Sequence, residues 1–131
     1  MRFLFKKVGS MNNRLHNCKN PHQGISKKVL CVCSAGLLRS PTAAKVLWQE
    51  FGYNTRACGI DTEYALVPLD SVLLDWCDEV VCMDKHQEIE LMTLTHKPII
   101  NLSIKDNFEY MNETLVDLIK VGYGREKDQH K

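Results

Sequence analysis

The sequence predicts an α/β protein of three layers, α/β/α, in which helices cover both faces of a four-stranded parallel sheet. Short apolar runs alternate with longer amphipathic segments, which is the pattern of repeated strand-helix units. The apolar runs are continuous rather than alternating, as expected for strands that are buried on both faces. The 131 residues, 44% hydrophobic and 25% charged, suit one soluble domain with a sizeable core.

The predicted elements follow one another closely along the chain. The first strand is the apolar run 29–32, and the first helix, 41–51, carries apolar side chains at the spacing i, i+3, i+4 and i+7. The remaining elements are strand 56–60, helix 68–76, strand 80–83, helix 85–94, strand 99–102 and a helix from about residue 113.

Apolar stripes indicate which helix faces pack on the sheet. We expect them to be core rather than binding surface. The stripes comprise Ala44, Leu47, Trp48 and Phe51 in the first helix, Leu69, Val72, Leu73 and Trp76 in the second, and Leu115, Leu118 and Ile119 in the last.

Capping residues predict where several helices begin and end. Ser40 and Pro41 are typical of an N-cap followed by the first helical position. Asp84, three residues before Gln87, forms an ordinary capping arrangement for the helix 85–94. Gly122 is typical of a C-terminal cap on the last helix.

The charge distribution divides the chain into three parts. Residues 1–28 contain seven basic side chains and no acidic one, which leaves a net charge of −6 for the rest. We therefore expect a flexible basic extension over 1–27, a domain over 28–124 and a polar tail over 125–131. The extension suits nucleic acid or another anionic partner, or is simply a solvated tail.

The composition also indicates where in the cell the protein acts and whether it binds zinc. No apolar run approaches the roughly 18 residues of a membrane span, so we expect a cytoplasmic protein without a membrane partner. The six cysteines, several of them in apolar strands, are expected to be reduced thiols. The chain contains no Cys-x2-Cys pair and no closely spaced His pair, so we expect no zinc site.

The segment 29–44 carries the most informative pattern. It reads Val-Leu-Cys-Val-Cys-Ser-Ala-Gly-Leu-Leu-Arg-Ser-Pro-Thr-Ala-Ala and joins the first strand to the first helix. Such a loop points several backbone N–H groups at one spot, and the helix dipole adds positive potential there. The loop therefore predicts a phosphate-binding site formed by Ser34, Ala35, Gly36, Leu37, Leu38, Arg39 and Ser40.

Cys33 and Arg39 give this loop a Cys-x5-Arg pattern. The positive potential of the loop favours the thiolate of Cys33, which is its nucleophilic form. The planar guanidinium of Arg39 can bind two phosphate oxygens at once. The alternative is a buried structural cysteine beside an unrelated arginine. We expect Cys33 to attack phosphorus and Arg39 to bind the phosphate, without a metal ion or other cofactor.

At these residues the chain resembles the low-molecular-weight protein tyrosine phosphatases, whose loop reads Cys-x5-Arg-Ser-Pro-Thr-Ala. The segments 55–59 and 105–111 are similar to the family's second strand and acid loop, and the likeness is strongest to a short bacterial and phage-type branch. The resemblance covers roughly residues 28 to 122. It implies a flavodoxin-like sheet, a phosphocysteine intermediate and a phosphotyrosine protein as substrate, with a small aryl phosphate as the alternative.

The leaving oxygen needs a proton donor on the far side of the phosphate from Cys33. We expect Asp106, which lies after the last strand and matches the family's acid, although the usual Asp-Pro-Tyr is Asp-Asn-Phe here. Asp84 is the alternative. The same resemblance implies that the Ser40 hydroxyl donates to the Cys33 thiolate in addition to capping the helix.

Three aromatic residues, Tyr64, Phe108 and Tyr110, fall in loops at the expected site edge and are candidate walls for a phenyl phosphate, or else core residues. Two other functions remain open. An arsenate reductase would need resolving cysteines, and Cys77 and Cys82 are the pair available. A non-catalytic phosphate-binding module would follow if the altered acid loop cannot donate a proton.

Overall fold

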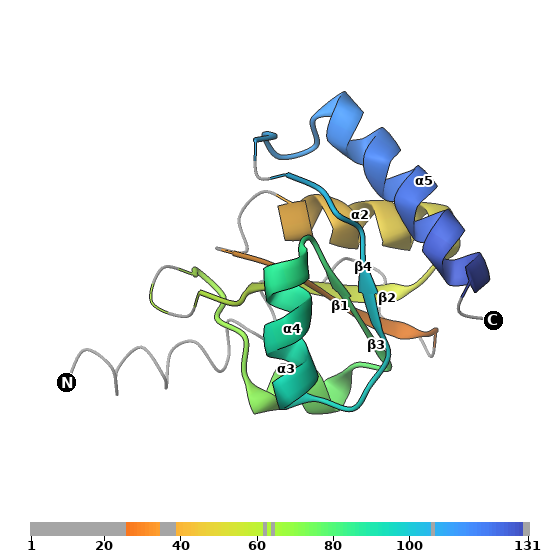
Figure 1. The fold of residues 1–131 in the computed structure, drawn as a ribbon. Coiled ribbons are helices and arrows are strands. Elements are labelled where there is room, and N and C mark those ends of the chain that lie inside the picture. Colours follow the sequence, from red (N-terminus) through yellow and green to blue (C-terminus); the bar gives the residue numbers. More distant parts are fainter. Residues whose placement is uncertain (1–25, 35–38, 62, 64, 106, 130–131) are drawn as a thin grey trace.

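The computed structural model describes residues 26–34, 39–61, 63, 65–105 and 107–129, with side chains as far as residue 125 (Figure 1). Nearly all of the predicted basic extension lies outside these residues. So do Ala35, Gly36, Leu37 and Leu38 of the phosphate loop, as well as Tyr64 and Asp106. The domain boundaries at the amino-terminal side therefore stay a prediction.

A four-stranded sheet with the order β2-β1-β3-β4 forms the centre of the protein, and all neighbouring strands pair in parallel. This is the strand order of flavodoxin-like sheets. The strands are β1 (Lys28–Cys33), β2 (Asn54–Gly59), β3 (Glu79–Cys82) and β4 (Ile99–Asn101). The helices are α2 (Arg39–Phe51), α3 (Ser71–Trp76), α4 (Lys85–Leu94) and α5 (Glu113–Gln129).

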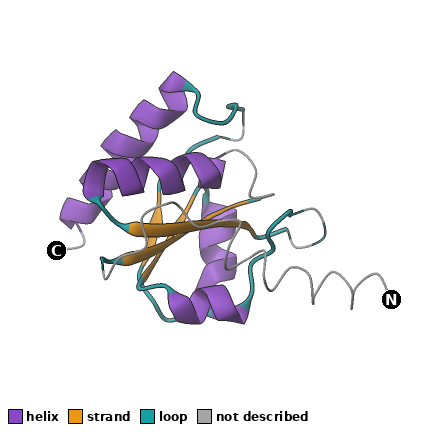
Figure 2. Cartoon of the chain, turned by 180° about the vertical axis from the view of Figure 1, so that it is seen from behind, coloured by secondary structure: helices purple, strands orange, loops and turns teal. Residues whose placement is uncertain are grey.

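The helices form a layer on each face of the sheet, as predicted (Figure 2). The helices α2 and α5 cover one face, and α3 and α4 cover the other (Figure 1). Successive residues of β1 alternate between two apolar clusters, Cys31 and Cys33 in the first and Leu30 and Val32 in the second. This alternation follows from the period of two along a strand. Both faces of β1 are therefore buried.

The arrangement of helices places a crevice at the carboxyl edge of the sheet. The chain leaves β1 for α2 on one face and leaves β3 for α4 on the other. Because β1 and β3 are neighbours, the segments that follow them diverge. Ligands of open parallel sheets bind at this kind of switch point.

At the amino ends of the strands, opposite the crevice, polar and aromatic side chains form a cluster. Glu79 accepts hydrogen bonds from the Lys27 ammonium and the Tyr123 hydroxyl, both at 2.8 Å. The Tyr123 ring packs against Phe51 and Tyr53, with ring centroids 5.0 and 6.0 Å away. Burial, followed by the nearby Glu79 carboxylate, raises the pKa of Tyr123. This cluster fixes α5 to the sheet.

Three local predictions were wrong. Gly122 does not end the last helix, because α5 continues to Gln129 and Tyr123 is held in the core. The domain boundary expected at residue 124 stays a prediction. Ser40 is not the N-cap of α2, which begins one residue earlier. Leu118 is 42% exposed, whereas its stripe neighbours Leu115 and Ile119 are fully buried.

The other predicted elements agree with the structure within one to three residues. Helix α4 has the bounds expected from the sequence, and Asp84 is its N-cap. Within the described part of the chain, none of the helices has the length and apolar character that crossing a bilayer requires.

Candidate active site

An open pocket of about 460 Å³ lies at the carboxyl edge of the sheet. Its walls come from the segments that follow β1, β3 and β4, as expected for this fold. The lining residues are Ser34, Arg39, Met83, Asp84, Lys85, Ser103, Ile104 and Lys105.

Cys33 is the last residue of β1 and is only 3% exposed. Its Sγ lies 3.1 Å from the Ser40 Oγ, which in turn donates to the Cys58 carbonyl oxygen at 3.2 Å. Loss of the thiol proton would leave a thiolate that the Ser40 hydroxyl can turn to and donate to. Here the Cys33 thiol is the donor and the Ser40 hydroxyl the acceptor, so donation from Ser40 to a thiolate stays a prediction.

The start of the phosphate loop is held by the segment after β2. The Cys33 carbonyl accepts from the Ile60 N–H at 2.8 Å, and the Ser34 carbonyl accepts from the Asp61 N–H at 2.9 Å. These bonds fix the backbone on both sides of the bond between Cys33 and Ser34. They also fix the position of the sulfur at the end of β1.

Arg39, the first residue of α2, is 2% exposed, and contacts on both terminal nitrogens hold its guanidinium. The Nη1 group donates to the Ile104 carbonyl at 2.8 Å, and Nη2 donates to the Ser34 Oγ at 3.3 Å. The Ile104 N–H donates to the Met83 carbonyl at 2.8 Å, so β3 fixes the acceptor as well. The plane of the guanidinium is thereby set before any ligand arrives.

The backbone before Ile104 is strained. Ser103 has a φ of 54°, which lies in the left-handed region that non-glycine residues rarely adopt. Its N–H donates to the Asn101 Oδ1 at 2.8 Å. The sharp turn directs the next residue back toward β3, where the Ile104 carbonyl meets Arg39. This strain is part of how the protein positions the guanidinium.

Three other cysteines of the described residues, Cys31, Cys77 and Cys82, are also buried. The five cysteines of the described residues carry thiols rather than disulfides. Burial raises the pKa of the Cys31 and Cys77 thiols, and it raises that of Cys82 to about 12. Cys77 and Cys82 belong to the apolar cluster on the other face of the sheet from Cys33. This separation weighs against their acting as resolving thiols.

Asp84 lines the pocket, but its carboxylate also caps α4. The Oδ1 atom accepts from the Gln87 N–H at 2.8 Å. This cap gives Asp84 a structural role at the start of α4. Asp106, the preferred acid, lies outside the described residues, so its assignment stays a prediction.

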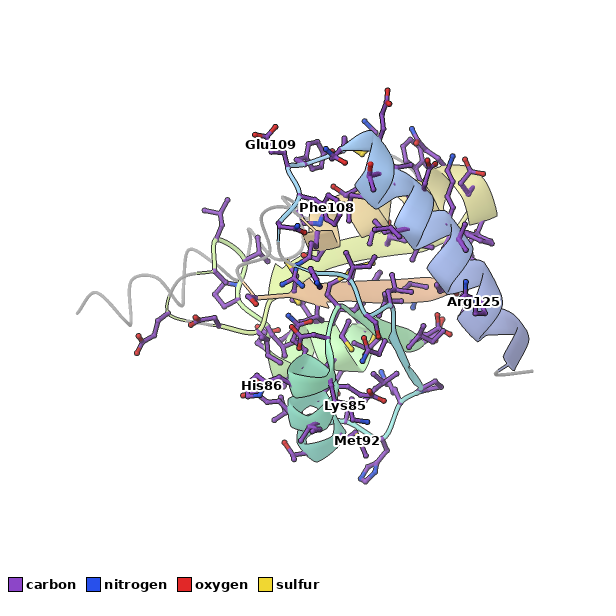
Figure 3. All side chains as sticks on the ribbon, turned by 45° about the horizontal axis from the view of Figure 1, so that its top comes forward. Lys85, His86, Met92, Phe108, Glu109 and Arg125 are labelled. Atoms are coloured by element: carbon purple, nitrogen blue, oxygen red, sulfur yellow. The ribbon has the colours of Figure 1, made fainter. Side chains whose placement is uncertain are left out.

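The described aromatic candidates do not line the pocket. Phe108 is half-buried and packs against the apolar cluster under α2 and α5. Tyr110 is 49% exposed. Figure 3 shows Phe108 and Glu109 on the segment that leads into α5, away from Lys85 and His86 at the start of α4. The Met111 N–H donates to the Thr42 Oγ1 at 2.9 Å, which joins this segment to α2.

The structure adds residues that the sequence analysis had not assigned to the site. Lys85 and Lys105 line the pocket with Arg39 and bring further positive charge to it. Gln87 had been interpreted only as a capping residue. Its amide in fact reaches the Ser34 Oγ at 3.3 Å. No sequence pattern indicates the contribution of the Ile104 carbonyl, because it is a backbone group.

No family model matches the sequence, and no curated protein matches it. Among solved structures, the chain is similar to the tyrosine phosphatase Wzb from Escherichia coli K30 in complex with phosphate. The TM-score is 0.62 at 12% sequence identity, over 80% of this chain and 99% of Wzb. It is also similar to a mutant of YwlE from Bacillus subtilis, with a TM-score of 0.57 at 19% identity, over 81% of this chain and 100% of YwlE.

The likeness expected from the loop is thus confirmed at the level of the fold. The four-stranded parallel sheet with helices on both faces is the shared architecture.

Proposed function

We propose that the protein hydrolyses phosphomonoesters through a phosphocysteine intermediate and acts as a protein tyrosine phosphatase. The observation that carries this proposal is that Arg39 and Ser34, the residue directly after Cys33, contact each other at 3.3 Å and line one pocket at the carboxyl edge of the sheet. The similarity to the tyrosine phosphatase Wzb, which was solved with phosphate, supports the same chemistry.

In the first step, the Cys33 sulfur attacks phosphorus and the bond from phosphorus to the ester oxygen breaks. The Arg39 guanidinium and the backbone N–H groups of the loop stabilise the charge on the equatorial oxygens. Asp106 protonates the departing oxygen. In the second step, water attacks the phosphocysteine, gives its proton to the Asp106 carboxylate and releases the thiolate and inorganic phosphate.

Ser40 supports the sulfur in both steps. Its hydroxyl lies 3.1 Å from Sγ and can turn from the Cys58 carbonyl to the thiolate. A hydrogen bond to the charged form of a group favours that form. Ser40 therefore stabilises Cys33 both as nucleophile and as leaving group.

The charge of the pocket and the similarity to the tyrosine phosphatase Wzb support a substrate class. The pocket contains Arg39, Lys85 and Lys105, which suit a dianionic phosphate and acidic groups beside it. We propose phosphotyrosine proteins as substrates, with small aryl phosphates as the alternative. The placement of Cys77 and Cys82 on the far face of the sheet disfavours an arsenate reductase.

Hydrolysis of p-nitrophenyl phosphate by the wild type and by Cys33→Ser tests the proposal. We expect the wild type to turn over and the variant to lose hydrolysis while it still binds vanadate, because the proposed phosphate contacts come from Arg39 and the loop rather than from the thiol. Cys58→Ser, on the neighbouring strand and facing the other apolar cluster, is the matched control. Turnover near the wild-type rate in Cys33→Ser would refute the thiol mechanism.

A further inference from the structure

The amide of Gln87 has only one orientation in this structure. Gln87 lies in the first turn of α4 and is 1% exposed. Its Oε1 accepts from the Met83 N–H at 2.8 Å. Because a backbone N–H can only donate, the amide oxygen and not the amide nitrogen must face Met83. The Nε2 group is therefore the end that faces the Ser34 Oγ, at 3.3 Å.

The Ser34 hydroxyl oxygen receives two donors. Gln87 Nε2 and Arg39 Nη2 both lie 3.3 Å from it. An amide NH2 group and a guanidinium can only donate, and a hydroxyl oxygen has two acceptor sites. Both acceptor sites of Ser34 are thus occupied, and its own proton must point elsewhere.

The remaining direction leads toward the pocket. Ser34 lines the pocket beside Arg39, and within the part of the chain that the structure describes no acceptor is found for its hydroxyl proton. A phosphoryl oxygen bound by Arg39 would meet this proton. A neutral hydroxyl whose lone pairs are already held by two donors is a polarised and oriented donor.

We propose that the Ser34 side chain donates a hydrogen bond to a phosphoryl oxygen of the substrate, and that Gln87 is the positioning residue that orients this hydroxyl. The inference rests on the proposed function in that it requires phosphate in this pocket. It adds a side-chain donor to the backbone groups of the loop, and it gives the start of α4 a role in binding. Gln87 never touches the substrate.

Binding of inorganic phosphate, measured by titration calorimetry, tests this role without requiring turnover. Ser34→Ala removes the donor, and we expect phosphate affinity to fall about tenfold, as for a hydrogen bond to a charged group. Gln87→Glu keeps an acceptor for the Met83 N–H. Its second oxygen accepts the Ser34 proton and turns it away from the phosphate, so we expect a similar loss.

The double variant separates orientation from charge. If Gln87→Glu acts by turning the Ser34 hydroxyl, the double variant Ser34→Ala/Gln87→Glu should bind phosphate no more weakly than the weaker single variant. If the new negative charge acts directly, the two losses multiply. His86→Glu adds the same charge one position earlier on the exposed side of α4 and should change the affinity by less than about twofold.

Multiplying losses in the double variant would overturn the role of Gln87. Wild-type affinity in Ser34→Ala would overturn the whole inference, and so would a wild type that binds no phosphate. Failure of the proposed function is a distinct result. It appears as phosphate binding without hydrolysis, or as full turnover by Cys33→Ser, and leaves the binding comparison intact.

Discussion

At the scale of single residues, the contacts of Arg39 fix the orientation of its guanidinium. Its two terminal nitrogens donate to different acceptors, the Ile104 carbonyl and the Ser34 hydroxyl. These contacts hold the guanidinium plane at the pocket wall before a phosphate binds. A lysine at this position has one ammonium group and cannot reproduce both the contacts and the planar fork.

Arg39→Lys should therefore be almost as damaging as Arg39→Ala. We expect both to lower kcat/KM for p-nitrophenyl phosphate by at least about 100-fold, the size of the loss when one preorganised transition-state donor is removed. Arg125→Lys, an exposed change on α5, should leave kcat/KM unchanged. A lysine variant with nearly intact kcat/KM would show that charge alone suffices.

The proton donor can be identified through its dependence on the leaving group. Asp106→Ala should lower cleavage of a tyrosine phosphopeptide by about 10²–10⁴-fold, since a poor leaving group needs the proton. The rate of phosphoenzyme formation from p-nitrophenyl phosphate, measured by stopped flow, should fall much less.

Asp84→Asn is the matched comparison, because asparagine keeps the N-cap bond to the Gln87 N–H while it cannot donate an acid proton. It should affect neither substrate strongly. A larger effect from Asp84→Asn than from Asp106→Ala, or equal losses on both substrates in Asp106→Ala, would show that the proton donor has been assigned to the wrong loop.

Part of this residue-level picture could be predicted from the sequence. Cys33 and Arg39 could be proposed as site residues from the spacing of the loop, because a strand, a small-residue turn and a helix start are typical of an anion site. The contact of Ser40 with the sulfur was implied only by the family resemblance. The contacts of Gln87 and Ile104 could not be found in that way. Gln87 matches a common capping pattern, and the direction of a backbone carbonyl depends on the turn at Ser103.

At the scale of the elements, side chains stabilise both ends of the short helix α3. Helix α3 has only six residues, and Asp70 caps its start by accepting from the Leu73 N–H. Its carboxyl end faces the Lys97 ammonium, which donates to the carbonyls of Asp75 and Cys77 at 2.8 and 2.6 Å, as well as to that of Leu74. A cation at this end also complements the helix dipole.

Lys97→Met should lower the free energy of unfolding by about 1 kcal/mol. The substitution keeps the apolar stem but removes the ammonium group that donates to three carbonyl oxygens. Urea unfolding followed by circular dichroism measures this. Lys120→Met removes a surface ion pair with Glu50 at 3.2 Å and should cost less than about 0.5 kcal/mol. Equal effects of the two substitutions would refute the capping role.

Element boundaries were predicted less well than the elements themselves. Apolar periodicity located all of the described strands and helices, but it does not report what happens at an end. Helix α5 passes Gly122 because Tyr123 is anchored by Glu79 from another part of the chain, and a local pattern contains no such information. Ser40 was predicted as a cap because its type suits one, whereas its hydroxyl is used at Cys33.

At the scale of the whole molecule, the order of strands explains where the site lies. The chain continues from the neighbouring strands β1 and β3 to opposite faces of the sheet. The pocket between the two segments is lined by Ser34 and Arg39 on one side and by Met83 and Asp84 on the other. The cluster with Glu79 and Tyr123 lies at the far end of the same strands. One end of the strands is thus packed by this cluster, and the other end forms the pocket.

Continuous apolar runs separated by helices were sufficient to predict the layers and the parallel sheet. The flavodoxin-like architecture came from the resemblance of the loop, and the structure confirms it through the strand order β2-β1-β3-β4. The pocket itself depends on three segments that are distant in sequence. Its shape therefore follows only from the assembled fold.

The central claim is that Cys33 carries the phosphoryl group during turnover. The most direct measurement is rapid quenching of the wild type with alkaline denaturant during hydrolysis of p-nitrophenyl phosphate, followed by peptide mapping by mass spectrometry. We predict one phosphoryl group per chain, attached to the sulfur of Cys33 and absent from Cys33→Ser. Hydrolysis that continues with no phosphoryl group on Cys33, or with the group on Ser34, Ser40 or another cysteine, would contradict the account.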